Sequence, residues 1–359
     1  MIKKLKLALL TLCLLLAALS AYALAAGGDA SDPLASLSYL TGPFTDAVDE
    51  KVAEKLDEAA GSGESSAGSS SASWQELRLK EGDSLEGTTG TSFLLLAGSG
   101  RFDFSAGTVV YVTTGTPVAS GTALTVNHRY LVAEDTAASL LVTSKTAVVD
   151  YQGTHTLSLS NSTDYNAIAS ALKTLHLFQG SFTGYGSGYD LEVAPTRLQA
   201  LIMFIRVLGE EEEALAYTGG TPFTDITPGT QSEKYVGYAL SKGYTNGYSA
   251  TTFRPSQTVT ASQYVEFLLR ALGYSSAENK DLSATLTNAL ANGVITPGEL
   301  AALQSGTFLR ADLAYVSYYA LDALVAGSDQ TLGQLLLEQG VFTSREWNEA
   351  RDSVPSGRM

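Results

Sequence analysis

The stretch that decides the fold of the second half of the chain occurs twice. Residues 196–209 read TRLQALIMFIRVLG and residues 260–273 read TASQYVEFLLRALG, a constant offset of 64 residues. In both stretches apolar residues recur at three- and four-residue spacing, a threonine precedes the run, and a glycine ends it. This pattern is typical of an amphipathic helix with an N-terminal cap and a glycine stop. The sequence therefore predicts two equivalent helices, each with one buried face.

Flanking residues extend the repeat. Tyr189 aligns with Phe253, and Arg206 aligns with Arg270, at the same offset. A third, weaker copy is marked by Phe308, Arg310 and Asp312. Each copy reads as helix, glycine-rich loop, helix, and such a unit cannot bury its apolar face alone. We therefore expect three repeats sharing one core, at residues 161–209, 223–273 and 280–326.

The second copy resembles the S-layer homology (SLH) repeat of bacterial cell-surface proteins. The resemblance rests on an F-x-D pair at Phe223 and Asp225, a glycine loop at residues 243–247, an F-x-P motif beginning at Phe253, and Thr260 before the second helix. It covers roughly residues 163 to 326 when the other copies are included. It implies a pseudo-threefold helical bundle whose grooves hold an acidic secondary cell-wall polysaccharide, often through a pyruvylated sugar.

The family's I-T-R-A-E motif is matched unevenly. Thr196 and Arg197 match its threonine and arginine, and Arg310 matches the arginine although Leu309 replaces the threonine. In the second copy Ala261 stands where the arginine is expected, so that groove is a weaker candidate. The first copy departs in lacking the opening F-x-D and in carrying Leu and Gln where the family has Ala and Glu.

The threonine and arginine also support an anion site by their own chemistry. Thr196 is a good helix cap, and the N–H groups of the first turn, together with the helix dipole, favour an anion. The guanidinium of Arg197 is a planar fork suited to a carboxylate. The candidate polysaccharide-binding residues are Thr196, Arg197, Arg310, Thr260, Asp225, Tyr189 and Phe253.

Several of these candidates have a purely structural alternative. Arg197 could pair with Glu192 or lie solvated at the helix end. Asp225 suits a turn or cap, whereas Tyr189 and Phe253 suit loop anchoring as well as stacking on a sugar ring. These alternatives stay open at the level of sequence.

The N-terminal part of the chain reads as a leader followed by a spacer. Three lysines precede an apolar run and a small-x-small site, which predicts a signal peptide at residues 1–25. Residues 26–60 read as a leading segment and a helix. Residues 61–73, GSGESSAGSSSAS, are almost all small and predict a flexible linker.

Residues 74–160 have short apolar runs separated by Gly, Thr and Asn, which predicts a small all-β module, a sandwich, roll or barrel. The expected fold class is thus α and β in separate domains, with this module followed by an all-α bundle and a helical tail at residues 327–359. We find no nucleophile elbow, P-loop or zinc-protease motif in the sequence.

Composition excludes several kinds of partner and site. There are 22 basic against 37 acidic residues and no long basic run, so nucleic acid is not an expected partner. A single cysteine and three histidines leave little for a disulfide, a metal site or a bound cofactor. Removal of a leader with three lysines would leave 19 − 37 = −18, so an acidic polymer must be held by local arginines.

The sequence as a whole predicts a secreted, non-catalytic protein of a bacterial cell wall, of Gram-positive type, without a membrane span once the leader is removed. Its expected partner is an acidic, pyruvylated wall polysaccharide, with other surface-layer proteins as a second partner class. Two alternatives remain: the β-module is a carbohydrate-binding or adhesive domain displayed by the anchor, or the protein is a wall-anchored hydrolase.

Overall fold

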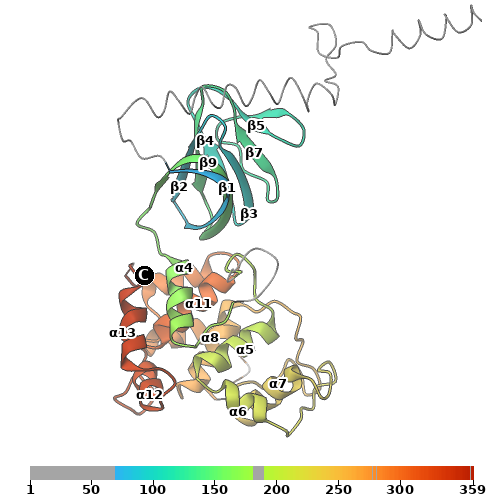
Figure 1. Ribbon diagram of the computed structural model, residues 1–359. Coiled ribbons are helices and arrows are strands. Elements are labelled where there is room, and N and C mark those ends of the chain that lie inside the picture. The colour runs from blue at the N-terminus through green and yellow to red at the C-terminus, as the bar shows by residue number, and fades with distance from the viewer. Residues whose placement is uncertain (1–68, 181–189, 277, 280, 356) are drawn as a thin grey trace, which may run out of the picture. The chain divides into compact units, whose positions relative to one another are not determined.

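The computed structural model describes residues 69–180, 190–276, 278–279, 281–355 and 357–359 (Figure 1). A β-rich region comes first and a helical region follows, each with its own hydrophobic core. The predicted separation of α and β structure is therefore confirmed. The predicted leader, the helix expected within residues 26–60, residues 61–68 of the linker and Tyr189 lie outside the described residues.

The β-rich region is one curled antiparallel sheet with the order β4-β8-β2-β9-β3-β7-β5-β6, and β1 pairs with β9. Its strands are β1 Ser69–Lys80, β2 Ser84–Thr88, β3 Ser92–Ala97, β4 Gly100–Asp103, β5 Val109–Tyr111, β6 Thr116–Val118, β7 Arg129–Val132, β8 Ala137–Val142 and β9 Thr146–Ser158. The long strand β9 pairs with β1, β2 and β3 and so holds the sheet together.

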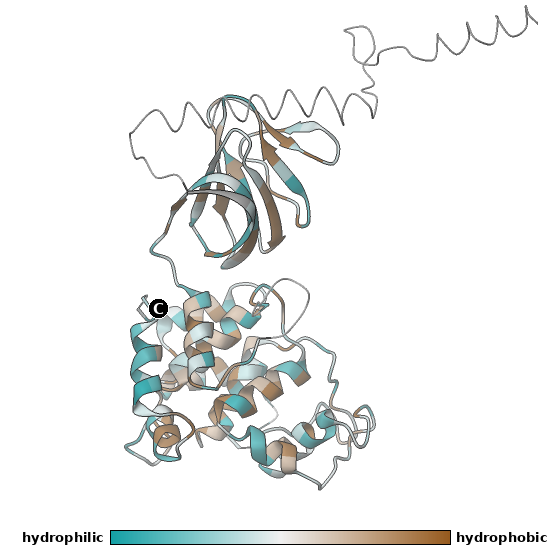
Figure 2. Cartoon of the chain, viewed as in Figure 1, coloured by the Kyte–Doolittle hydropathy of each residue, from teal (hydrophilic) through white to brown (hydrophobic). Residues whose placement is uncertain are grey.

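Alternation along the strands explains the core of this sheet. In β8 every second residue is buried, and the buried residues include Ala138 and Leu140. Inside the curled sheet these side chains join the same core as Phe93 and Phe102. The ring centres of the two phenylalanines lie 5.6 Å apart. Figure 2 shows the strands carrying most of the hydrophobic colour in this region.

Strand β1 begins earlier than the sequence pattern indicates. Residues 69–73 were predicted as the end of the linker, yet Ser69 pairs with His155 and Ser71 pairs with Gly153. Serine has no strong strand preference of its own, so the pairing comes from backbone hydrogen bonds to the long strand β9.

The helical region contains α4 Tyr165–Thr174, α5 Arg197–Val207, α6 Glu211–Ala216, α7 Gln231–Ser241, α8 Ala261–Ala271, α9 Thr285–Ala291, α10 Pro297–Gln304, α11 Arg310–Ala320, α12 Leu332–Glu338 and α13 Ser344–Asp352. The two repeated stretches at residues 196–209 and 260–273 form helices α5 and α8, and Thr196 and Thr260 cap them as predicted. No helix among the described residues is long and apolar enough to cross a membrane.

Three helices form the centre of this region. Helices α5, α8 and α11 contact one another pairwise, and outer helices pack on each: α6 and α7 on α5, α9 on α8 and α4 on α11. Their apolar faces form one continuous core that includes Phe204, Tyr264 and Tyr315. Inside it the hydroxyls of Tyr264 and Ser317 are 2.6 Å apart, which satisfies two polar groups that burial would otherwise leave without water.

The last two helices pack against the rest of the helical region. Helix α13 contacts α4, and Phe342 stacks on Trp347 with the ring planes 8° apart. Beyond α13, Arg358 donates to both carboxylate oxygens of Glu299, at 2.7 and 2.9 Å. Because Glu299 is 2% exposed, this ion pair fixes the tail to the N-terminal turn of α10.

Candidate functional site

A cavity of about 380 Å³ lies where α5, α8 and the glycine loop of the second copy meet. We call it the arginine cavity, because Arg197 and Arg270 both line it. Its other lining residues are Asn246, Gly247, Tyr248, Ser249, Ala250, Gln263, Glu266, Phe267, Asn279 and Leu282. The cavity thus combines two cations, several polar groups and an aromatic side chain, Tyr248, that is 54% exposed.

Arg197 is held in this cavity without an acidic partner. Its guanidinium lies 4.9 Å from the ring centre of Phe253 and 5.8 Å from that of Phe267. One terminal nitrogen donates to the hydroxyl of Thr245 at 3.3 Å, whereas Nε is buried with no hydrogen-bond partner among the described residues. A buried donor left unpaired costs roughly 1–3 kcal/mol, so Arg197 is poised to accept a ligand.

Burial, together with repulsion from Arg270, lowers the pKa of Arg197 to about 10. The guanidinium therefore stays protonated at neutral pH. An anion beside the guanidinium would raise the pKa of Arg197 again, because its negative charge would offset both the burial of the cation and the repulsion from Arg270.

The second cation, Arg270, is neutralised within the protein. It donates to Glu266 at 3.2 Å and to the backbone oxygens of Tyr244 and Asn279. Glu266 is 2% exposed and also accepts hydrogen bonds from Ser275, Asn279 and Thr285. The Arg270–Glu266 pair leaves the cavity with one uncompensated positive charge, that of Arg197.

The helix ends differ from the sequence-based expectation. At the start of α5 the N–H of Arg197 donates to the carbonyl of Gln257 at 2.7 Å, and that of Leu198 donates to Pro255 at 3.1 Å. At the start of α11 the N–H groups of Arg310 and Ala311 donate in the same way to Val193 and Leu191. The expectation that these helix ends are open to an anion is therefore wrong, because backbone carbonyls already occupy their donors. The guanidinium, not the helix dipole, is left to attract a ligand.

Asp225 braces the loop that carries the arginine cavity. Its two oxygens accept the N–H groups of Phe253 at 2.9 Å and Arg254 at 2.7 Å. Partial burial favours the neutral acid, but these hydrogen bonds outweigh it and lower the pKa of Asp225. Phe253 is completely buried, so its ring supports Arg197 and cannot reach a sugar in this structure. Both residues therefore position the site.

The same loop depends on one glycine. Gly247 has a φ of +75°, and a Cβ there would collide with the ring of Phe223. Positive φ and a close approach together explain why glycine ends the G-x-x-x-G pattern. Arg254 also has a positive φ of 61° and lies over the ring of Tyr248 at 3.4 Å.

Replacement of Asp225 by asparagine is expected to loosen this loop. The amides of Phe253 and Arg254 would lose a charged acceptor, and their hydrogen exchange should become faster while the core amides of α8 keep their rates. In the unsubstituted protein the lowered pKa of Asp225 determines how the stability of the loop depends on pH. The stabilisation by the Asp225 carboxylate is present above about pH 4 and is lost as the pH falls through the pKa of the folded state. Exchange followed by mass spectrometry between pH 2 and 6 measures this; equal rates in both proteins would show that the carboxylate does not brace the loop.

Arg310 has surroundings like those of Arg197 but with an acid nearby. Its guanidinium lies 5.7 Å from the ring centre of Phe178. Burial lowers its pKa, and Arg206 adds to this, whereas the charge of Asp190 acts in the opposite direction. Arg310 is thus a partly compensated cation, and the arginine cavity is the better anion site.

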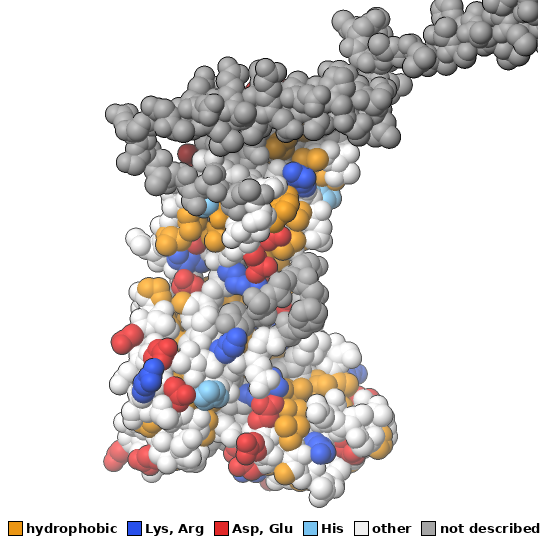
Figure 3. Space-filling model, in the orientation of Figure 1, with side chains coloured by type: hydrophobic (Ala, Val, Ile, Leu, Met, Phe, Trp, Pro, Cys, Tyr) orange, Lys and Arg blue, Asp and Glu red, His pale blue; other side chains and the backbone are white. Residues whose placement is uncertain are grey.

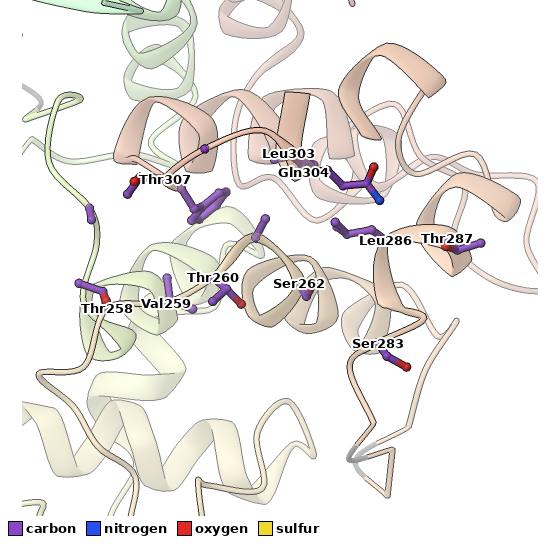
Figure 4. Close-up of a pocket in the computed structure, with 14 residues that line it drawn as sticks. Thr258, Val259, Thr260, Ser262, Ser283, Leu286, Thr287, Leu303, Gln304 and Thr307 are labelled. Carbon is purple, nitrogen blue, oxygen red and sulfur yellow. The ribbon is translucent and has the colours of Figure 1, made fainter. Parts of the chain in front are cut away.

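Thr260 lies on a different cavity, of about 460 Å³, which we call the hydroxyl cavity (Figure 4). Its walls are the segment before α8 with that helix's first turn, helix α9, and the end of α10 with the loop before α11. Its lining residues are Ala194, Thr258, Val259, Thr260, Ala261, Ser262, Ser283, Leu286, Thr287, Leu303, Gln304, Gly306, Thr307 and Phe308. None of them is charged.

Neither metal chemistry nor a broad basic surface is visible. Among the described residues no three His, Cys, Asp or Glu side chains gather as metal ligands would. On the face in Figure 3 the lysine and arginine side chains are scattered among acidic ones. On this face an anionic polymer would meet individual cations rather than a basic patch.

Residues 222–264 match the family model of the S-layer homology domain. The chain contains an S-layer homology domain. The matched SLH segment includes Asp225, residues 246–250 of the arginine cavity, Phe253 and Thr260, whereas Arg197 and Arg310 lie outside it.

Two bacterial surface proteins are similar to part of the chain. The middle cell wall protein of Brevibacillus brevis is 26% identical over 34% of this chain and 12% of its own length. The surface layer protein of Brevibacillus choshinensis is 28% identical over 26% of this chain and 9% of its own length. The chain thus matches only about a tenth of each of these relatives. A solved Clp1p–Pcf11p complex aligns with 43% of this chain and 32% of its own at 13% identity, with a TM-score of 0.14.

Sequence reasoning found part of this site. It selected Arg197 and the loop residues, but it missed Glu266, Thr245 and Tyr248, which complete the arginine cavity. One signal for the second cation was available, because Arg270 occupies the same position in its copy of the repeat as Arg206 does in the first copy. The pairing of Glu266 with Arg270 had a signal of its own, since their i,i+4 spacing on the predicted helix places the two side chains side by side.

Proposed function

We propose that the protein is held non-covalently at the cell wall by its helical region, which binds an acidic wall polysaccharide through the arginine cavity. SLH domains bind cell-wall polysaccharide in general, and the similar Brevibacillus proteins are named for the cell wall and the surface layer. The observation that carries the proposal is Arg197, a buried cation whose Nε lacks a partner and whose cavity holds one uncompensated positive charge.

The charge of the cavity favours a carboxylate. A carboxylate offers one negative charge and two oxygens, which match the single uncompensated charge and the planar donors of a guanidinium. Tyr248 at the rim supplies an exposed ring against which the sugar that bears the carboxylate can pack. A pyruvylated sugar is one carrier of such a group. The anchor in this proposal is non-catalytic, and it carries the β-rich region on the outside of a wall of Gram-positive type.

The helical region in this proposal consists of three SLH repeats related by a pseudo-threefold axis. The pairwise contacts of α5, α8 and α11 support this arrangement, as does the outer helix that packs on each of them, α7, α9 and α4. The cyclic order also explains how α4, early in the region, comes to pack on α11, late in it.

Co-sedimentation of the full chain with purified cell walls tests the anchoring role. We expect the protein to pellet with walls that carry their acidic polysaccharide and to remain in solution with peptidoglycan from which that polymer has been extracted. A protein that pellets equally with both, or with neither, would contradict the proposal.

A further inference from the structure

The hydroxyl cavity has an alanine at the position equivalent to Arg197 of the arginine cavity. The first residue of α5 is Arg197 and that of α11 is Arg310, whereas the first residue of α8 is Ala261. Ala261 lines the hydroxyl cavity, which therefore contains no charged side chain. Its volume of about 460 Å³ is within the range of sites for small molecules.

Most polar side chains of this cavity make no hydrogen bond with the part of the chain that the structure describes, although Thr260 accepts from the N–H of Gln263. Within the described residues, five lining side chains make no hydrogen bond, and they are Thr258, Ser262, Thr287, Thr307 and Gln304. A hydroxyl both donates and accepts, and the amide of glutamine does the same through two atoms. Figure 4 shows Thr258 and Ser262 on one side of the cavity and Thr307 and Gln304 on the opposite side. The cavity thus offers donors and acceptors from two facing walls.

Apolar side chains lie between these polar groups. Phe308 is 7% exposed and Leu286 is 8% exposed, and both line the cavity with Leu303. Apolar patches surrounded by neutral donors and acceptors match a pyranose ring, which has apolar C–H faces and a rim of hydroxyls. A carboxylate or phosphate is a poor match, because no cation lines the cavity and the chain has a net charge of −15.

We propose that the hydroxyl cavity binds an uncharged, hydroxyl-rich sugar unit of the wall polysaccharide, while the arginine cavity holds an acidic unit. This inference rests on the proposed anchoring function. In this proposal the alanine of the second repeat sets the specificity: a cavity without the arginine selects a neutral sugar, whereas the cavity with Arg197 selects an acidic one. The two sites then read different units of one polymer and add avidity without requiring a higher positive charge.

The test uses the full chain with two probes, the purified acidic wall polysaccharide and the same polymer after its carboxyl groups have been reduced to alcohols. Reduction removes the acidic group but preserves the neutral sugars. The unsubstituted protein should bind the native polymer tightly and the reduced polymer more weakly but saturably. Ser262→Leu, which fills the hydroxyl cavity, should weaken binding to the reduced polymer about tenfold, the effect of about 1.4 kcal/mol of lost contact.

Matched variants separate the possible outcomes. Ser344→Leu places the same substitution in the first turn of α13, away from the cavity lining, and should bind both polymers normally. The double variant Thr258→Val with Thr287→Val removes two hydroxyls without adding bulk. It should weaken binding to the reduced polymer, and it provides a test even if Ser262→Leu fails to fold. No binding of the reduced polymer, or unchanged binding by the double variant, would overturn the inference while anchoring stands. Failure to bind the native polymer would instead overturn the anchoring function.

Discussion

Replacement of Arg197 by glutamine is expected to weaken binding of the full chain to acidic wall polysaccharide about 30-fold. A hydrogen bond to a charged group contributes roughly 2 kcal/mol, and each 1.4 kcal/mol changes a dissociation constant tenfold. Glutamine retains part of the side-chain length and polarity but removes the only uncompensated charge of the arginine cavity. Isothermal titration or surface plasmon resonance at fixed ionic strength measures the change.

The same substitution should leave the fold intact. Arg197 is buried without an acidic partner, so its charge does not stabilise the folded state as an ion pair would. We expect the free energy of unfolding to fall by no more than about 1 kcal/mol, the value of its contacts with the rings of Phe253 and Phe267. Arg345→Gln on the exposed side of α13 makes the same change in net charge and serves as the control. Equal affinities for the two variants would show that the cavity does not bind the polymer.

Replacement of Arg270 by methionine should have the largest effect on stability. Glu266 would then be left buried without its cation, and breaking a buried pair in this way costs roughly 3–5 kcal/mol. Both side chains of the pair are almost fully buried, at 6% and 3% exposed, so solvent cannot replace the lost partner. Denaturant unfolding followed by circular dichroism measures the free energy of unfolding.

A second variant identifies the cause of that loss. Arg270→Met combined with Glu266→Gln removes both charges, and we expect it to recover part of the stability that the single variant loses. Arg345→Met on α13 should change the free energy of unfolding by no more than about 0.5 kcal/mol. If the Arg270→Met protein is as stable as the parent, the Arg270–Glu266 pair does not hold the cavity together.

Helix positions could be predicted from the sequence because their signals are local. The repeated apolar spacing and the capping threonines Thr196 and Thr260 fix α5 and α8 without reference to the rest of the chain. The start of β1 could not be predicted, because residues 69–73 gain their strand structure from a partner, β9, far along the sequence. Local composition indicated a linker there, and long-range pairing overrode it.

In the candidate site, too, the residues with a local sequence signal could be predicted, whereas the contacts made between distant parts of the chain could not. Arg197 was found because a motif arginine after a capping residue is a local pattern. The burial of Phe253 and the occupation of the α5 N–H groups by Gln257 and Pro255 depend on how two copies of the repeat meet, so they were not predictable. The hydroxyl cavity was equally hidden, because its walls come from α8, α9 and the segment before α11. Ala261 was noticed only as a missing arginine.

A crystal structure of the full chain with an acidic oligosaccharide from the wall polymer tests the central claim most directly. We expect a carboxylate oxygen within about 3 Å of a guanidinium nitrogen of Arg197, with the sugar ring against Tyr248. An oligosaccharide bound elsewhere on the protein, with no oxygen near this guanidinium, would contradict the proposal.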